Sequence, residues 1–436
     1  MDSKDNKKRK ESGQQSEQYS LYTERIVEKP SVKYRRLIRL AEMVVGGMVF
    51  GIFAAATFVI VYNYLSVAGA EQNRNKRPGI VIEKDEYPSE MQSAKADDSG
   101  QSETQQNAQV PFDGNAADIT MAAELSRYEM LQRGIELAGH TIVRVAGNRQ
   151  YGDNPFEDDS TFSAGVIFAE IDSEYLLLTR YDEVSAASDI TVQFGELSEV
   201  TGYYVKGDAD TGIAIVSIKE NDMPASARAY AKTASLGNSY TVVQGSPVIA
   251  AGHVMGTDFA VNTGITTSVV NKASLVDAYV GLIYTNMIPV MEDYGFLFDL
   301  NGNLIGIPVT GADNDVMTFY GISDLKALIE ELSNGYNVTY CGIIGENVTS
   351  AMAATYRLPI GVYITSVQEN SPAYHAGLQA GDVITSINDE AVLTFSAFSE
   401  KIYKLNGGDK ATINVKRLGK DDYKDILFSV TLGNKE

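Results

Sequence analysis

The stretch "MEDYGFLFDLNGNLIGI", residues Met291 to Ile307, contains the pattern that decides the fold. Two short apolar runs flank Asn301-Gly302, a pair that accepts the positive φ angles of a tight primed turn. Apolar runs of this length, separated by such a pair, predict two antiparallel strands joined as a hairpin. The stretch therefore indicates a β-rich domain, and the acidic Asp293 just before the hairpin becomes a candidate functional residue.

The same pattern of short apolar runs separated by turn residues extends over most of the chain. The 436 residues include 38 glycines and 11 prolines, and 44% of them are hydrophobic, which suits a turn-rich β protein with two or three domains. Beyond Thr141 short β-like runs recur at regular intervals, which favours a barrel or a sandwich. The segment "LKALIEEL" (Leu325–Leu332) predicts a helix and a domain boundary, and a small α+β module follows from Val338.

The N-terminal part predicts a membrane anchor. Residues Met43–Tyr62 contain no charge and are long enough to cross a bilayer as a helix. Basic residues (Arg35, Arg36 and Arg39) precede this run, so the positive-inside rule places residues 1–40 in the cytoplasm and the bulk of the chain outside. A cleaved signal peptide is the alternative, since "AGA" (Ala68–Ala70) resembles a cleavage site, but the tail before the apolar run is long for that role.

Charge and composition narrow the classes of partner and cofactor. Residues 1–40 carry eleven Lys or Arg and six Asp or Glu, whereas the other 396 residues carry 25 and 51. The part of the chain after residue 40 is therefore strongly acidic and repels phosphate backbones. For this reason we expect no nucleic-acid binding. Because the chain has a single cysteine, Cys341, it cannot form an internal disulfide, and we predict that Cys341 is a buried thiol. The chain has only three histidines, and we expect no metal site and no cofactor.

Several segments, in the order in which they occur, resemble the HtrA (DegP-type) family of trypsin-like serine proteases with a C-terminal PDZ domain. The segment "SAGVIFAEIDSEYLLLT" (Ser163–Thr179) resembles the strands that lead to the family's catalytic histidine. The segment "VKGDADTGIAIVSIK" (Val205–Lys219) resembles the stretch with the catalytic aspartate. The segment "GVYITSVQENSPAYHAGLQAGDVITSIND" (Gly361–Asp389) is similar to the family's PDZ sequence. The resemblance implies a mainly β protein: a trypsin-like double β-barrel plus an α+β PDZ domain, preceded by one transmembrane helix.

The positions that match the catalytic triad hold other residues. The resemblance aligns the histidine with Asp182, the aspartate with Gly212 and the nucleophilic serine with Asp293. Acyl transfer by a serine needs a hydroxyl, a base and a group that orients the base, and this chain has none of them at these positions. The sequence therefore predicts a catalytically inactive member.

Other functions stay open at this point. Asp182 and Asp293 could share a proton or hold a divalent cation if they meet across the old cleft. An endopeptidase with a non-standard catalytic arrangement is a second alternative, and a purely structural envelope protein is a third.

The PDZ-like module is expected to bind peptides by adding an extended C-terminus to a sheet edge. We predict that the loop and strand "LPIGVYI" receive the peptide and that the helix "FSAFSEKIYKL" faces it. The predicted peptide-binding residues are Leu358, Pro359, Ile360, Gly361, Val362, Tyr363, Ile364, Phe398 and Ile402.

The sequence thus predicts a membrane-anchored pseudoprotease that binds peptide C-termini or unfolded proteins in envelope quality control. Further expected partners are two more copies of the chain in a homotrimer, or active HtrA relatives. The expected organisation is a cytoplasmic tail (1–40), a transmembrane helix (41–66), a disordered acidic linker (67–120), a degenerate protease domain (121–335) and a PDZ domain (338–434).

Overall fold

The structure, a computed structural model, describes residues 79–86, 121–148, 161–195, 198–290, 293–309 and 315–435. All of them belong to one unit of the chain, which spans residues 78–436. The predicted cytoplasmic tail and the predicted membrane helix at Met43–Tyr62 lie outside the described residues. Within the described residues, no helix is both long enough and apolar enough to span a bilayer.

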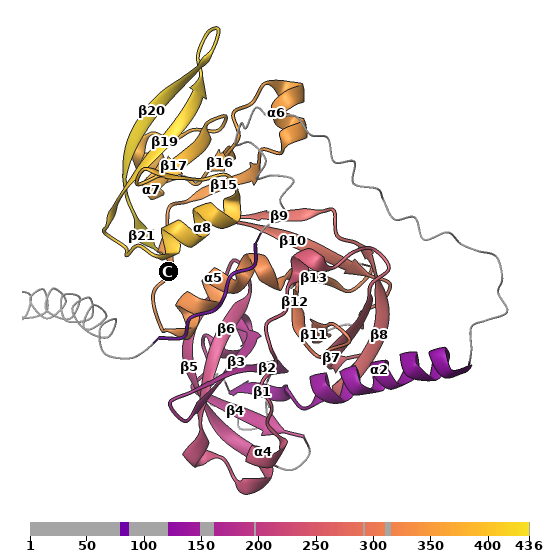
Figure 1. Cartoon of the computed structure of the whole chain (residues 1–436). Coiled ribbons are helices and arrows are strands. Elements are labelled where there is room, and N and C mark those ends of the chain that lie inside the picture. Colours follow the sequence, from indigo (N-terminus) through magenta and orange to yellow (C-terminus); the bar gives the residue numbers. More distant parts are fainter. Residues whose placement is uncertain are drawn as a thin grey trace, which may run out of the picture. The chain divides into compact units, whose positions relative to one another are not determined.

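The first barrel is a closed antiparallel sheet with the strand order β1-β2-β3-β6-β5-β4 (Figure 1). Its interior is mostly aliphatic, because residues such as Val143, Val145 and Leu177 point inward and are fully buried. Closure removes the exposed strand edges that an open sheet would have. The strands are β1 (Ile142–Asn148), β2 (Thr161–Ile171), β3 (Glu174–Arg180), β4 (Asp189–Phe194), β5 (Ser198–Asp208) and β6 (Ile213–Lys219).

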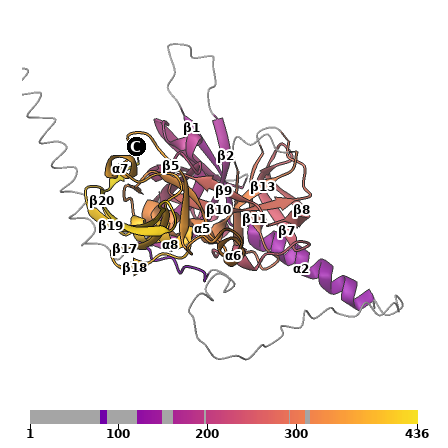
Figure 2. The same cartoon turned by 90° about the horizontal axis from the view of Figure 1, so that it is seen from above.

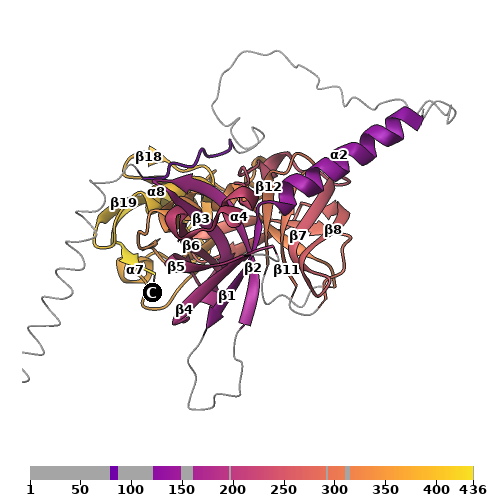
Figure 3. The same cartoon turned by 90° about the horizontal axis from the view of Figure 1, so that it is seen from below.

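The second barrel is built from a sheet with the order β13-β12-β11-β7-β8-β10-β9. It closes on itself because β10 also pairs with β13, with Leu282 opposite Tyr320. The two barrels lie side by side (Figures 2 and 3). The strands are β7 (Pro247–Val254), β8 (Thr257–Ser268), β9 (Lys272–Leu275), β10 (Ala278–Thr285), β11 (Tyr294–Phe298), β12 (Leu304–Pro308) and β13 (Thr318–Gly321).

The hairpin predicted from the opening stretch is present as β11 and β12, but its turn differs from the prediction. Gly302 has a positive φ of 75° and Asn301 does not, so the connection is not a primed two-residue turn. The Asp299 carboxylate instead accepts hydrogen bonds from the backbone N–H groups of Asn301 and Asn303, at 2.8 and 2.9 Å. These bonds stabilise a wider loop between the strands.

Helices of different lengths pack on the two barrels. The helix α2 packs on β7 and β8 (Figure 2). The amphipathic α5 follows β13 and leads into the PDZ domain. The helices of the barrel region are α2 (Met121–Gly139), α3 (Tyr181–Val184), α4 (Ala225–Tyr230) and α5 (Ile322–Ser333), with 3-10 turns η2 (Glu220–Asp222) and η3 (Ser239–Thr241).

The expectation that the whole of 67–120 is a disordered linker is corrected for residues 79–86, which we call the strap. The strap runs antiparallel to α5: Ile80 N–H donates to Asn334 at one end, and Asp85 forms an ion pair with Lys326 at the other. These distances are both 2.8 Å. Ile80 and Ile82 also pack against the hydrophobic core, which gives this short apolar part of an otherwise polar segment a reason to be ordered.

The PDZ domain has a sheet in the order β15-β16-β17-β19-β20, and β14 pairs with β21. Fully buried residues of β16, β17 and β19, among them Ile364, Ile384 and Ile413, pack against α8 residues such as Phe398. The elements are β14 (Thr339–Tyr340), β15 (Ile343–Asn347), α6 (Ser350–Tyr356), β16 (Val362–Val367), α7 (Pro372–Ala376), β17 (Val383–Ile387), β18 (Glu390–Ala391), α8 (Phe395–Tyr403), β19 (Lys410–Leu418), β20 (Tyr423–Thr431) and β21 (Gly433–Asn434).

Candidate functional site

Two of the three positions that the resemblance aligns with the catalytic triad are adjacent in the structure. Asp182 lies on α3, directly after β3, and its side chain is 69% exposed beside the guanidinium of Arg180, at 3.7 Å. Gly212 lies in the turn before β6, and its carbonyl accepts a hydrogen bond of 2.8 Å from the N–H of Tyr181. The fold therefore brings positions 182 and 212 together, but a glycine has no side chain that could orient a base.

The carboxylate at the third position, Asp293, is used to hold two loops together. Its oxygens accept hydrogen bonds from the backbone N–H groups of Met255 and Gly256, both at 3.0 Å, and of Val290 at 2.8 Å. Met255 and Gly256 form the turn between β7 and β8. An Asp at this position therefore stabilises a turn of the second barrel, and its acceptor capacity is directed at the backbone.

Tyr294, the residue after Asp293, fills space between the barrels. Its side chain is 2% exposed and belongs to the core cluster that joins Leu178 and Ile213 of the first barrel to Phe296 of the second. Burial raises the pKa of the Tyr294 phenol; the nearby charges of Arg180 and Asp182 act on it in opposite directions. A bulky ring thus lies beside the degenerate triad positions.

His253 lies opposite Tyr294 in the pairing of β7 with β11, and its side chain belongs to a separate polar network. Its Nδ1 is 2.7 Å from Asp258, whose other oxygen is 3.0 Å from the guanidinium of Arg144. The ring of Phe162 meets the imidazole edge to face. Within the described residues, no group of three or more His, Cys, Asp or Glu side chains is arranged to hold a metal ion.

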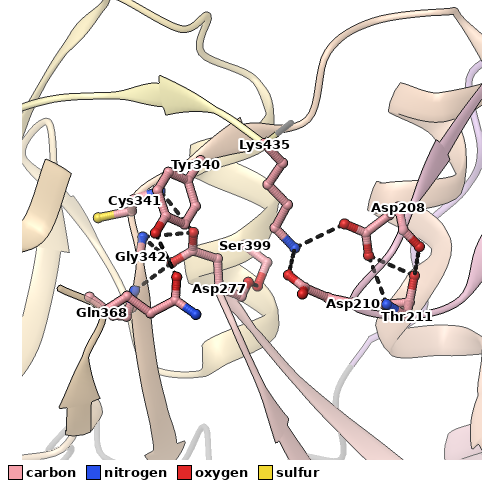
Figure 4. Close-up of polar contacts among 11 residues, drawn as sticks. Asp208, Asp210, Thr211, Asp277, Tyr340, Cys341, Gly342, Gln368, Ser399 and Lys435 are labelled. Carbon is pink, nitrogen blue, oxygen red and sulfur yellow. Dashed lines mark hydrogen bonds and ion pairs between the residues drawn. The ribbon is translucent and has the colours of Figure 1, made fainter. Parts of the chain in front are cut away.

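A different site in the PDZ domain is built to bind a carboxylate (Figure 4). The backbone N–H groups of Cys341, Gly342 and Ile343, here called the nest, point at one side chain, the carboxylate of Asp277. The donor–acceptor distances are 2.8 Å from Cys341, 2.9 and 3.0 Å from Gly342, and 2.9 Å from Ile343. Consecutive N–H groups that converge in this way form an anion-binding concavity.

The nest depends on Gly342. Its φ is +90°, and a Cβ there would lie only 2.2 Å from the Cβ of Ser371. Both the backbone conformation and the space therefore require glycine at this position.

The carboxylate arrives from the second barrel. Val276 and Asp277 form the hairpin tip between β9 and β10, and this tip lies against β15 and α8. The Asp277 side chain is fully buried, with a backbone φ of +56°. Burial raises the pKa of the Asp277 carboxyl, and the three N–H donors and the Lys435 ammonium oppose that rise.

The helix α8 completes the enclosure of the hairpin tip. The Ser399 hydroxyl donates to the Asp277 carbonyl at 2.7 Å, and the Asp277 N–H donates to the Ile343 carbonyl at 2.8 Å. The predicted peptide-binding residues Phe398 and Ile402 lie on this helix and are fully buried.

The predicted docking edge at β16 needs correction. This strand pairs with β15 on one side and with β17 on the other, so it offers no open edge. Gly361 allows a close approach to its own sheet, because a Cβ there would lie 2.1 Å from the Ile384 carbonyl oxygen. The sheet ends at β15 on one side and at β20 on the other, and β15 is the edge strand next to β16. Contact of the residues from Leu358 to Ile364 with a peptide stays a prediction.

A second contact ties the PDZ domain to the first barrel. The Lys435 ammonium lies 3.0 Å from Asp208 and 2.8 Å from Asp210 (Figure 4). Asp208 is 1% exposed and also accepts hydrogen bonds from the N–H and hydroxyl of Thr211. The attraction of the nearby carboxylates outweighs burial and raises the pKa of Lys435.

Comparison with known proteins agrees with this architecture. The PDZ domain family matches residues 305–432. The "Probable periplasmic serine endoprotease DegP-like" of Pseudomonas savastanoi pv. phaseolicola is 29% identical over 312 residues, which cover 67% of this chain and 59% of that protein. The "Serine protease Do-like HtrA" of Bacillus subtilis is 26% identical over 297 residues, 63% of this chain and 65% of that protein.

The predicted resemblance to HtrA-type serine proteases with a C-terminal PDZ domain is confirmed. Among solved structures, "HtrA-type protease AlgW with tripeptide" is similar in fold, with a TM-score of 0.50 and 20% identity. The match covers 70% of this chain and 97% of that one. This chain spans about three fifths of the length of the Pseudomonas savastanoi relative, which is described as periplasmic.

Sequence reasoning missed the nest, although its pattern is present in the chain. The segment Tyr340-Cys341-Gly342-Ile343 places a glycine between two apolar residues at the start of an edge strand. The sequence predicts a buried thiol at Cys341, and the structure confirms that Cys341 is buried. Asp277 gave a weaker signal: it is a single acid among apolar residues at a hairpin turn, and only folding brings it to the nest.

Proposed function

We propose that this chain is a membrane-anchored HtrA-like pseudoprotease that binds peptide C-termini or unfolded proteins through its PDZ domain. The proposed loss of proteolysis is supported by one observation: the Asp293 carboxylate accepts hydrogen bonds from three backbone N–H groups. A carboxylate held in this way supplies no hydroxyl nucleophile, and its oxygens are directed at the backbone. The observation that supports peptide recognition is a nest of three N–H groups that already holds a carboxylate.

The proposal includes a location outside the cytoplasm and a role in envelope protein quality control. It is supported by the periplasmic description of the DegP-like relatives and by the apolar run Met43–Tyr62. Partners would be a second and third copy of the chain or active HtrA relatives. The exposed side chains of α2, with Tyr128 66% and Met130 52% exposed, are available for such contacts.

Proteolysis is tested with the full-length chain in detergent micelles. Casein should remain intact, and a fluorophosphonate probe should leave the protein unlabelled, because no hydroxyl occupies the nucleophile position. The Asp293→Asn variant is the comparison. Casein fragments that appear with the wild type and disappear with this variant would instead establish an aspartate-dependent enzyme.

Peptide recognition is tested with a pool of fluorescent decapeptides that end in Ala, Val, Leu, Ile or Phe. We expect saturable binding of the pool with free carboxylates and no binding of the same pool with C-terminal amides, because an amide lacks the charge that the nest selects. Equal binding of both pools would contradict recognition of the C-terminus.

A further inference from the structure

The hairpin tip meets the nest as an added peptide strand would. The N–H of Asp277 donates to the carbonyl of Ile343 on the edge strand, as the N–H of a terminal residue does in strand addition. The Asp277 side-chain carboxylate occupies the place of a terminal carboxylate, one methylene further from the backbone, and accepts from three consecutive N–H groups. Val276 takes the place of the residue before the terminus.

We propose that Asp277 is an internal ligand that occupies the peptide-carboxylate site of the PDZ domain, so that the described state is closed to peptide C-termini. This inference rests on the proposed function, since it takes the nest to be the site of peptide recognition. It adds that the chain regulates this site itself.

Full burial shows that the site has a single occupant at a time. Asp277 has no exposed surface, and its carbonyl is held by the Ser399 hydroxyl of α8, the helix that faces the edge strand. A peptide carboxylate cannot reach the three N–H groups while the Asp277 carboxylate is bound to them. Peptide binding and docking of the hairpin tip therefore exclude each other.

The turn alone does not explain a buried carboxylate at this position. The φ of +56° at Asp277 belongs to the region that Gly, Asn and Asp adopt in turns, and Gly or Asn would form the same turn without burying a charge. A buried carboxylate also carries a large desolvation cost unless donors satisfy it. The nest supplies these donors, and the Lys435 ammonium is close enough to lower the pKa of this carboxyl.

Competition by an internal ligand has a measurable consequence. The apparent Kd of a peptide equals the intrinsic Kd divided by the fraction of molecules in the open state. If fewer than about one molecule in ten is open, removal of the internal ligand tightens binding by at least about tenfold.

The experiment compares full-length wild type with Asp277→Gly in binding the free-carboxylate decapeptide pool. Glycine removes the carboxylate and accepts the positive φ, so the hairpin keeps its turn. Asp277→Asn is a second variant, which keeps the size of the side chain and removes its charge. Asp293→Asn is the matched control, because Asp293 also accepts three backbone N–H bonds, but outside the nest.

We expect both Asp277 variants to bind the pool more tightly than wild type, with about a tenfold gain or more for Asp277→Gly, and Asp293→Asn to match wild type. Equal affinity of wild type and both Asp277 variants would overturn the internal-ligand proposal and leave peptide recognition standing. No binding by any of the chains would overturn the proposed recognition, and the internal-ligand proposal with it.

Discussion

At the scale of single residues, the position aligned with the catalytic serine and the residue after it have structural roles. Asp293 fastens the β7–β8 turn, and Tyr294 fills the space between the barrels. Triad residues introduced at the three aligned positions would therefore not by themselves build a serine-protease site, because a serine at 293 would release a turn and the ring of Tyr294 would remain beside it.

The buried phenol of Tyr294 makes the stability of the fold sensitive to alkaline pH. Burial raises its pKa above the ordinary value of about 10, so the folded state keeps the proton after the unfolded state has lost it. The stabilisation is complete below about pH 10 and decreases as the pH rises further. Between about pH 9.5 and pH 11, we expect the free energy of unfolding to fall by about 1 kcal/mol more in wild type than in Tyr294→Phe.

Urea unfolding at the two pH values measures this difference. Tyr128→Phe is the matched control, because the Tyr128 side chain is 66% exposed on α2. Parallel loss of stability in wild type and in Tyr294→Phe would show that the Tyr294 phenol is not the group responsible.

At the scale of elements, α5 and the strap form one unit. The ammonium of Lys326 is 5% exposed and pairs with Asp85, which also accepts a hydrogen bond of 2.6 Å from the Ser323 hydroxyl. A lysine buried to this extent needs a carboxylate partner. The strap therefore supplies a charge that α5 requires.

We expect Asp85→Ala to lower the free energy of unfolding by about 3 kcal/mol, because it leaves the Lys326 ammonium buried without its partner. Chemical denaturation of the full-length chain gives this number. Glu83→Ala changes an exposed residue of the same strap and should stay within about 0.5 kcal/mol of wild type. Equal, small effects of both substitutions would mean that the strap contributes little.

At the scale of the whole described unit, two contacts between charged groups help to hold the PDZ domain on the barrels. Asp277 of the second barrel enters the nest, and Lys435 of the PDZ domain reaches Asp208 and Asp210 of the first. Both contacts bury charged groups, so each stabilises the docked arrangement only while its partners are in place.

A double-mutant cycle tests the second contact. Lys435→Met leaves Asp208 buried without a cation, and we expect a loss of about 3 kcal/mol in the free energy of unfolding. In combination with Asp208→Asn the loss should be smaller than the sum of the two single losses, by about 1 kcal/mol or more. Additive losses, measured by urea unfolding, would mean that the two side chains do not interact.

Sequence reasoning predicted the local features of this molecule better than the distant ones. The hairpin of β11 and β12, the helix α5 and the β-rich architecture follow from apolar periodicity within short segments. The turn at Asn301 was predicted wrongly, because the Asp299 carboxylate competes for its backbone N–H groups.

The candidate site was harder to predict because it joins residues far apart in the chain. Asp277 and the nest are 64 to 66 residues apart, and no local pattern reports that contact. The assignment of β16 as an edge strand failed for the same reason, since strand order depends on pairings between distant segments. The positions that the resemblance aligns with the triad could be named from the sequence, but the structural roles of Asp293 and Tyr294 could not.

The path of the strap has a mechanical consequence. Its bonds to Asn334, Glu330 and Lys326 are spaced along the length of α5, so tension applied from the N-terminal side would load them together, in shear. A load of that kind is resisted by several bonds at once and does not open them one after another. A tether pulled from the direction of residue 79 would thus transmit force to α5, the helix from which the chain continues into the PDZ domain.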